Sequence, residues 1–268
     1  MPGTFAEKLA GASRSNKSLV CVGLDPDPAL MPIADVVAFN KEIIAATKDL
    51  VCAYKPNLAF YEAMGLDALR IFYETRKAVP DSIPVIGDAK RGDIGNTARA
   101  YAKALFDVLG VDGATVSPYL GYDSLEPFLD YSDKGIFILC RTSNAGSADF
   151  QGLAVGGKDL LYEVVARKSK EWNEKGNVGL VVGATFPQEL VRVREICPDM
   201  PILIPGVGAQ GGALEEAVRG GADAAGERAI INSSRGIIFA SRGKDFATAA
   251  HKAAQTLRDQ INAIRWGK

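Results

Sequence analysis

The sequence predicts an α/β protein, a (β/α)8 TIM barrel in a single domain with an additional N-terminal helix. Short β-branched apolar runs recur eight times along the 268 residues, and each is followed by a longer amphipathic stretch. The runs are continuous rather than alternating, which is typical of parallel strands covered on both faces. Each strand and helix together take about 33 residues, the size expected of such a barrel.

The expected strands cover residues 18–24, 50–56, 83–89, 111–117, 135–141, 177–183, 200–206 and 228–234. Apolar residues at spacings of three and four predict helices over 38–50, 61–79, 96–110 and 187–197. We expect residues 4–14 to form the extra helix and to close the bottom of the barrel. The weakly apolar segment GADAAGERA does not fix where the last strand starts.

The main alternative fold is a doubly wound open sheet. It is disfavoured because no GxGxxG follows the first strand, where CVGLDPDP stands instead. No linker or low-complexity segment divides the chain, so residues 1–268 are assigned to one domain.

The charge and hydropathy of the sequence exclude some classes of binding partner. Lys and Arg number 31 and Asp and Glu 32, a net charge of −1 that would not attract nucleic acid or an anionic membrane. No apolar run of about 18 residues appears and the first residues lack a signal-peptide core, so we expect a soluble cytoplasmic protein. An anionic ligand must therefore be held by local groups.

Cysteine and histidine exclude several kinds of site. The four cysteines have no CxxC spacing, and three lie in apolar strand-like runs, so buried free thiols are expected. The single histidine, His251, is expected on a helix surface near the C-terminus. A Ser-His-Asp triad is excluded and a His-built zinc site is implausible.

Polar residues follow the predicted strands, at the end of a TIM barrel where the chemistry takes place. Each has a structural explanation on its own: Asp25 could cap the turn before Pro26, and Lys55 could be a solvated strand end. Together they converge on one mouth, which favours a functional site. The set is Asp25, Lys55, Asn57, Asp88, Lys90, Asp93, Ser117, Thr142, Ser143, Gly206 through Gln210, Ser234 and Arg235.

The segment GDAKRGDIGNT carries the densest charge. Asp88 and Lys90 are two apart on an extended chain and so share a face, while Asp93 lies at the turn into the next helix. Carboxylates interleaved with ammonium groups make a poor magnesium cage, so we expect a metal-free site. Our hypothesis is that the aspartates keep Lys90 charged, and that its ammonium stabilises a developing carbanion and then protonates it.

Two glycine-containing segments predict a phosphate site. PGVGAQGG follows the seventh strand and NSSRG the eighth, where backbone N–H groups and a helix N-terminus hold phosphate in many barrels. Arg235 would add a charge-assisted fork. A glycine-rich loop alone could be only a turn, but this placement predicts a substrate with a phosphate monoester.

These motifs resemble, in content and order, the orotidine 5'-phosphate decarboxylases of the longer-chain bacterial type: GLDPDP, YKPN, DAKRGD, TSNAG, PGVGAQGG and NSSRG. The resemblance covers nearly the whole chain. It implies decarboxylation of orotidine 5'-monophosphate to UMP and CO2 in de novo pyrimidine biosynthesis, without a cofactor.

The resemblance also implies a role for each matching residue. Lys55, Asp88, Lys90 and Asp93 would form a charged tetrad, with Asp88 against the substrate carboxylate and Lys90 the proton donor to C6. Asp25 and Lys55 would bind ribose hydroxyls. The base and phosphate would be bound by Ser143, Gly206, Gly208, Gln210, Ser234 and Arg235. Asp93 and Thr97 would reach into the neighbouring subunit's site, which implies a homodimer.

One departure is Ala145, where many relatives have proline, and it could loosen the loop. Residues 144–157 are small enough to form a lid over the base, the alternative being a mobile connector.

Three other functions remain alternatives. A magnesium-dependent sugar-phosphate decarboxylase or aldolase would need an acid at the end of the second strand, where Lys55 stands. A Schiff-base aldolase would need Lys55 or Lys90 to lose its proton readily, which Asp88 and Asp93 oppose. A non-catalytic sensor of phosphate ligands would have no need of Lys90.

Overall fold

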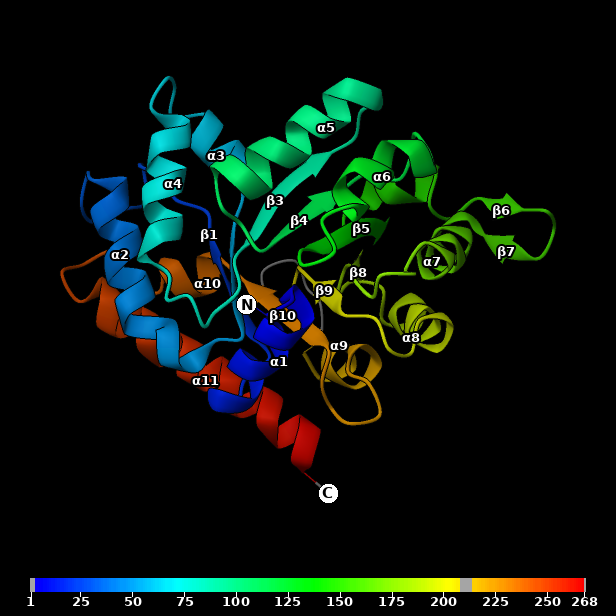
Figure 1. Cartoon of the computed structure of the whole chain (residues 1–268). Helices are drawn as coiled ribbons and strands as arrows, with labels where there is room; N and C mark the ends of the chain where they lie inside the picture. The colour runs from blue at the N-terminus through cyan, green and yellow to red at the C-terminus, as the bar shows by residue number, and fades with distance from the viewer. Residues whose placement is uncertain (1–2, 208–213, 268) are drawn as a thin grey trace.

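The computed structural model describes residues 3–207 and 214–267. Eight parallel strands form one sheet in the order β2-β1-β10-β9-β8-β5-β4-β3, and parallel bridges from Tyr54 to Val85 and from Asn57 to Asp88 join β2 to β3. The sheet is thereby closed into a barrel surrounded by helices (Figure 1). The strands are β1 (Val20–Leu24), β2 (Ala53–Pro56), β3 (Ile86–Arg91), β4 (Gly113–Val116), β5 (Gly135–Arg141), β8 (Val178–Val182), β9 (Ile202–Ile204) and β10 (Ala229–Ser233).

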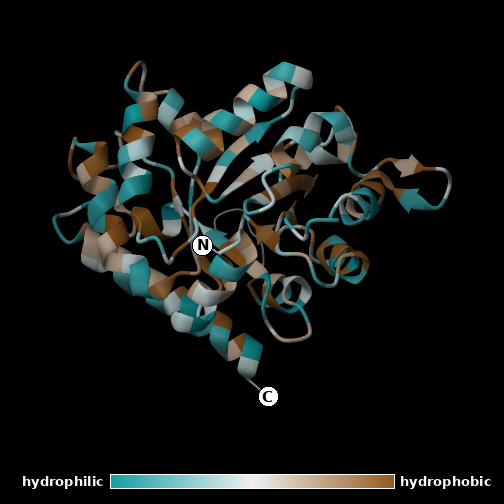
Figure 2. Ribbon diagram, in the orientation of Figure 1, coloured by the Kyte–Doolittle hydropathy of each residue, from teal (hydrophilic) through white to brown (hydrophobic). Residues whose placement is uncertain are grey.

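All eight predicted strands and the barrel are confirmed, and the last strand starts at Ala229. The helices are α1 (Phe5–Ser15), α2 (Val36–Thr47), α3 (Leu58–Glu62), α4 (Ala68–Ala78), α5 (Gly95–Lys103), α6 (Tyr122–Leu129), α7 (Leu161–Glu171), α8 (Pro187–Ile196), α9 (Leu214–Gly221), α10 (Arg235–Ile238) and α11 (Phe246–Trp266). Their surfaces alternate between apolar and polar stripes (Figure 2), as expected where one face packs on a sheet and the other meets water.

The helix predicted over 61–79 is wrong in one respect, because the structure divides this stretch into α3 and α4. Gly65 lies between them with φ +90°, a backbone conformation that is easy for glycine and incompatible with a continuous helix. The apolar spacing continues across the break, which is why the pattern suggested one helix.

The N-terminal helix closes the bottom of the barrel, as predicted. α1 begins with a capping box between Thr4 and Glu7, and the Phe5 ring packs edge-on against Phe137 of β5 with centroids 5.4 Å apart. A Cβ atom at Gly135 would lie 2.6 Å from the Phe5 ring, so the ring fits against the start of β5 only because residue 135 is glycine.

The cysteines and the histidine also lie as predicted. All four thiols are free and buried, and burial raises the pKa of Cys52 to about 12 and that of Cys197 to about 11. His251 is exposed on α11. Within the described part of the chain, no helix combines the length and apolarity needed to cross a bilayer.

Candidate active site

A cavity of about 480 Å³ opens at the carboxyl ends of β1, β2, β9 and β10. Predicted site residues from four strands or their following loops line it: Asp25, Lys55, Asn57, Gly206, Ser234 and Arg235. The barrel thus brings together residues that are up to 210 positions apart, as the strand-end argument predicted.

Asp88 is at the centre of a charged cluster beside this cavity. Its Oδ2 accepts a hydrogen bond from Lys55 Nζ at 3.0 Å, and its Oδ1 accepts one from Lys90 Nζ at 2.6 Å. Lys55 and Asp88 are only 4% and 8% exposed, whereas Lys90 reaches solvent. A buried carboxylate is therefore held between a buried and an accessible ammonium group.

The charges of the buried pair stabilise each other. Burial acts to lower the pKa of Lys55, but the carboxylates of Asp88 and Asp25 outweigh it and hold that pKa well above its ordinary value. Burial acts to raise the pKa of Asp88, but the Lys55 and Lys90 ammonium groups hold it well below its ordinary value. Both groups are charged at neutral pH.

The backbone of β3 departs from a regular strand where it carries Lys90. The pairing of β3 with β4 shifts register between Gly87 and Arg91, and Lys90 has φ +47°, which is uncommon for a residue with a side chain. The side chains of Asp88 and Lys90 do meet on one face, as predicted. Their arrangement depends, however, on this register shift and on the unusual φ of Lys90, and not on regular strand alternation alone.

Asp25 lies at the end of β1 with an unsatisfied oxygen. Its Oδ1 is buried and has no hydrogen-bond partner among the described residues. Behind it, the buried Tyr61 hydroxyl donates to the carbonyl of Leu24 at 3.0 Å and accepts from Asn40 Nδ2 at 3.1 Å. A buried carboxylate oxygen without a partner, beside a cavity, is suited to accept hydrogen bonds from a ligand.

The structure describes part of the predicted phosphate-binding site, namely Gly206, Ser234 and Arg235. Gly206 has φ +94°, and Ser234 and Arg235 lie where β10 passes into the short helix α10. A Cβ at Gly23 would lie 1.8 Å from Ser234 Oγ, so any larger residue at position 23 would clash with this serine. Gly208 and Gln210 lie outside the described residues.

Ser143 lies near the start of the loop after β5, and Arg141, the last residue of that strand, holds the loop. Arg141 is 5% exposed; its guanidinium lies 3.6 Å from the centroid of the Phe186 ring and hydrogen-bonds Ser147. Gln151 Oε1 also accepts from Thr142 N at 2.8 Å. Residues 144–157 contain the 3-10 helix η3 (Ala145–Asp149) and one strand of the hairpin β6 (Ala154–Val155) and β7 (Asp159–Leu160), which lies beside α7 at the edge of the molecule (Figure 1).

Asp93 and Thr97 are not brought to the Lys55–Asp88–Lys90 cluster. Asp93 Oδ1 accepts from the backbone of Ile94 at 2.8 Å, and Thr97 is exposed in the first turn of α5. Ile94, between them, is 57% exposed. Within the described ranges Asp93 forms no ion pair.

Sequence reasoning missed three residues near the mouth. Thr115 of β4 contacts Asp88, Arg141 holds the loop after β5, and Asn232 lines the cavity with its Oδ1 buried and unpartnered within the described part of the chain. Thr115 could have been found, because it lies two residues before Ser117 and so shares its face of the strand.

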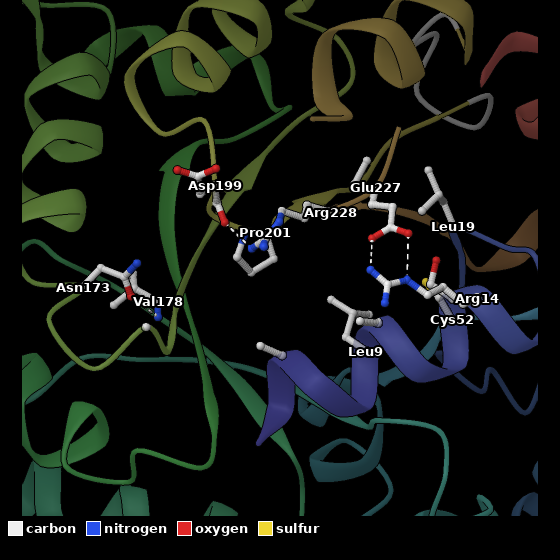
Figure 3. A pocket seen from close by; sticks show the side chains of 15 residues that line it. Leu9, Arg14, Leu19, Cys52, Asn173, Val178, Asp199, Pro201, Glu227 and Arg228 are labelled. Carbon is white, nitrogen blue, oxygen red and sulfur yellow. Dashed lines mark hydrogen bonds and ion pairs between the residues drawn. The ribbon is translucent and has the colours of Figure 1, made fainter. Parts of the chain in front are cut away.

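A second cavity, of about 110 Å³, lies at the opposite end of the barrel between α1 and the starts of several strands (Figure 3). Two of its charged residues pair with each other, because Arg14 donates to Glu227 through two nitrogens at 3.0 and 2.9 Å. The candidate active site is therefore the cavity at the carboxyl ends.

A closed parallel barrel with charged residues gathered at the carboxyl ends of its strands defines the class of (β/α)8-barrel enzymes. The chain belongs to the family described as "Orotidine 5'-phosphate decarboxylase / HUMPS family", whose model matches residues 18–252.

Curated relatives and solved structures agree with this family. An orotidine 5'-phosphate decarboxylase of Dehalococcoides mccartyi is 58% identical over 97% of this chain and 98% of its own. One of Ralstonia pickettii is 51% identical over 97% and 99%. The structure of Leishmania donovani OMP decarboxylase superimposes with a TM-score of 0.89 at 44% identity, covering 98% of this chain and all of that one.

Proposed function

We propose that this protein decarboxylates orotidine 5'-monophosphate to UMP and CO2 in pyrimidine biosynthesis. The observation that carries the proposal is the Lys55–Asp88–Lys90 cluster at the mouth of the barrel, in a chain 58% identical to an orotidine 5'-phosphate decarboxylase. The family model alone is broader, since its description also covers HUMPS.

The chemistry needs a fixed positive charge beside C6. When the bond from C6 to the carboxylate carbon breaks, CO2 leaves and the electron pair stays at C6 as a poorly delocalised vinylic carbanion. Lys90 Nζ stabilises this charge and then transfers a proton to C6. Asp88, held ionised by Lys55 and Lys90, lies against the substrate carboxylate and favours its departure.

The remainder of the substrate is bound away from C6. Asp25 and Lys55 bind the ribose hydroxyls, Ser143 the pyrimidine, and Gly206, Gly208, Ser234 and Arg235 the phosphate, with Gln210 bridging base and phosphate. These contacts contribute binding free energy that closes residues 144–157 over the base and excludes water. A substrate without phosphate therefore loses turnover as well as affinity.

We further propose that the chain is one domain, acts in the cytoplasm, and forms a homodimer in which Asp93 and Thr97 complete the partner subunit's site. The support is that Asp93 makes its hydrogen bond with the neighbouring backbone and Thr97 faces solvent, so neither contributes to the charged cluster of its own chain.

The test is loss of orotidine 5'-monophosphate absorbance with purified protein in EDTA, comparing the unmodified enzyme with Lys90→Ala. Lys175→Ala is a matched control, because Lys175 also pairs with an aspartate and is similarly exposed, 46% against 49%. We expect metal-free turnover that Lys90→Ala abolishes and Lys175→Ala preserves.

Two outcomes would overturn the proposal. Activity seen only with magnesium, on a sugar-phosphate acid, would assign the chain to the metal-dependent alternative. Borohydride trapping of Lys55 or Lys90 with a carbonyl substrate would indicate a Schiff-base aldolase.

A further inference from the structure

The buried hydroxyl of Thr115 joins the two functional parts of β3. It donates to Asp88 Oδ1 at 2.8 Å and accepts from the backbone N–H of Lys90 at 3.0 Å. Thr115 is 1% exposed and belongs to the neighbouring strand, β4. No predicted role involved this residue.

We propose that Thr115 is a positioning residue for decarboxylation: its hydroxyl fixes the Lys90 backbone relative to Asp88 and so sets where the Lys90 ammonium meets C6. The inference rests on the proposed role of Lys90 as proton donor. Thr115 itself need not touch the substrate.

The direction of both hydrogen bonds follows from the partners. An ionised carboxylate can only accept, so the single hydroxyl hydrogen of Thr115 must point to Asp88. A backbone N–H can only donate, so the lone pairs of Thr115 must face Lys90. Because one oxygen atom makes both hydrogen bonds, the Lys90 backbone cannot move far from Asp88 without breaking one of them.

β3 lacks regular backbone pairing around Lys90, so a side-chain contact has to stabilise it there. The regular pairing of β3 with β4 is interrupted between Gly87 and Arg91 and resumes where Ser117 N donates to Arg91 O at 2.8 Å. Lys90, inside the interruption, has the left-handed φ of +47° that costs free energy for a non-glycine residue. The Thr115 side chain takes the place of a backbone acceptor and stabilises this conformation.

Removing the hydroxyl should therefore change chemistry more than binding. In Thr115→Val, which has the same shape, Lys90 is free to shift, and a displacement of about 1 Å at a reacting group can cost on the order of 100-fold in rate. Thr115→Ser retains the hydroxyl. Thr47→Val is the matched control, because Thr47 is also fully buried and bonds another hydroxyl, that of Tyr54 at 2.8 Å, outside the site.

The experiment measures kcat and KM for orotidine 5'-monophosphate, the Kd of UMP by calorimetry, and exchange of the C6 hydrogen of UMP in D2O by proton NMR. The exchange reports proton transfer at C6 without any decarboxylation. We expect Thr115→Val to lower kcat and exchange by roughly 10- to 100-fold and to leave the Kd of UMP within about threefold. Thr115→Ser should recover most of both rates, and Thr47→Val should lower only the Tm.

Several results would overturn the inference: unchanged kcat in Thr115→Val, no recovery in Thr115→Ser, or an equal loss of kcat in Thr47→Val. If Thr115→Val does not fold, Thr115→Ala replaces it, and failure of both to fold would assign Thr115 to fold stability instead. Failure of the proposed function itself is separate, because the unmodified enzyme would then show no turnover.

Discussion

Asp88 accepts hydrogen bonds from side chains on three neighbouring strands: Lys55 on β2, Lys90 on its own strand β3 and Thr115 on β4. Lys55 is deeply buried, so its charge depends on this carboxylate. One side chain thus contributes both to the stability of the barrel and to the arrangement of the site.

Asp88→Asn is expected to remove activity and to destabilise the protein. The substitution leaves the Lys55 ammonium buried opposite a neutral amide, and breaking a buried pair in this way costs about 3–5 kcal/mol of unfolding free energy. Urea unfolding measures the loss. Asp130→Asn is the control, since Asp130 pairs with Lys175 on the surface and should lose no more than about 1 kcal/mol; equal losses would contradict the argument.

The stability that this pair contributes should be independent of pH over a wide range. The pKa of Asp88 is lowered in the folded state, so its contribution is complete above about pH 4 and is lost as pH falls toward that lowered pKa. The pKa of Lys55 is raised, so its contribution is complete below about pH 10 and is lost as pH rises toward that raised pKa.

We therefore expect the difference in unfolding free energy between unmodified protein and Asp88→Asn to be fully present at about pH 5 and to shrink below about pH 4, where the carboxylate of the unmodified protein begins to be protonated. Urea titrations at several pH values measure it. A difference that stayed unchanged as the pH fell well below 4 would show that the pKa of Asp88 is not lowered as described.

The sequence predicted the charged residues but not how they are held. The spacing of Asp88 and Lys90 placed them on one face because side chains alternate along a strand. The left-handed backbone at Lys90 and its bond to Thr115 depend on the register of β3 against β4, which is set by tertiary packing and has no signature in the local sequence.

At the scale of the elements, the conformation of the loop after β5 is stabilised by the buried guanidinium group of Arg141. Arg141 stacks on Phe186, which lies in the loop between β8 and α8, and it hydrogen-bonds Ser147 in η3. Thr142 and Gln151 form a second contact across the same loop. Small residues at 144–157 predicted a lid or a mobile connector, and in this structure these polar contacts restrain the first half of the segment.

Arg141→Met is expected to free residues 144–151 while the barrel remains folded. Hydrogen bonds to a charged group contribute about 1.5–3 kcal/mol, so the amides of this segment should exchange with deuterium at least roughly tenfold faster. Hydrogen–deuterium exchange with mass spectrometry measures it. Arg192→Met, which removes the pair between the half-exposed Arg192 and the buried Glu163 of α7, is the control and should leave residues 144–151 unchanged.

Helix boundaries were the weakest part of the sequence prediction at this scale. Apolar spacing identifies a face that packs on the barrel, and it continues through Gly65 where α3 ends and α4 has yet to begin. A glycine with positive φ breaks the backbone without breaking the pattern of side chains.

For the whole molecule, the strand count and order of polar strand ends were sufficient to predict a barrel whose carboxyl end carries a cavity lined by several of the predicted residues. The second subunit could be inferred only from resemblance. Asp93 and Thr97 lie apart from the Asp88 cluster within one chain, and a single sequence does not encode which surface a partner covers.

The proposed shared sites give a direct test by mixing inactive variants. In a mixed dimer of Lys90→Ala and Asp93→Ala, one site carries both substitutions and the other carries neither. Random exchange of subunits should restore roughly a quarter of the unmodified activity, because half of the dimers are mixed and each has one intact site.

Activity after mixing, with dimer formation checked by light scattering, measures the outcome. Lys90→Ala mixed with Asp88→Ala is the control and should restore nothing, because both substitutions fall on the same chain's share of each site. Recovery in that control, or none in the test mixture, would exclude sites shared as proposed.

The helix at the bottom of the barrel bears on the order in which a newly made chain can fold. α1 is synthesised before the strands that it packs on, yet Phe5 N donates to Asp133 O at 2.8 Å and the Phe5 ring needs Gly113 and Gly135. Arg14 waits longer still for Glu227, 213 residues later. During synthesis Phe5 cannot make these contacts until β4 and β5 have emerged, so α1 completes its packing well after it is made.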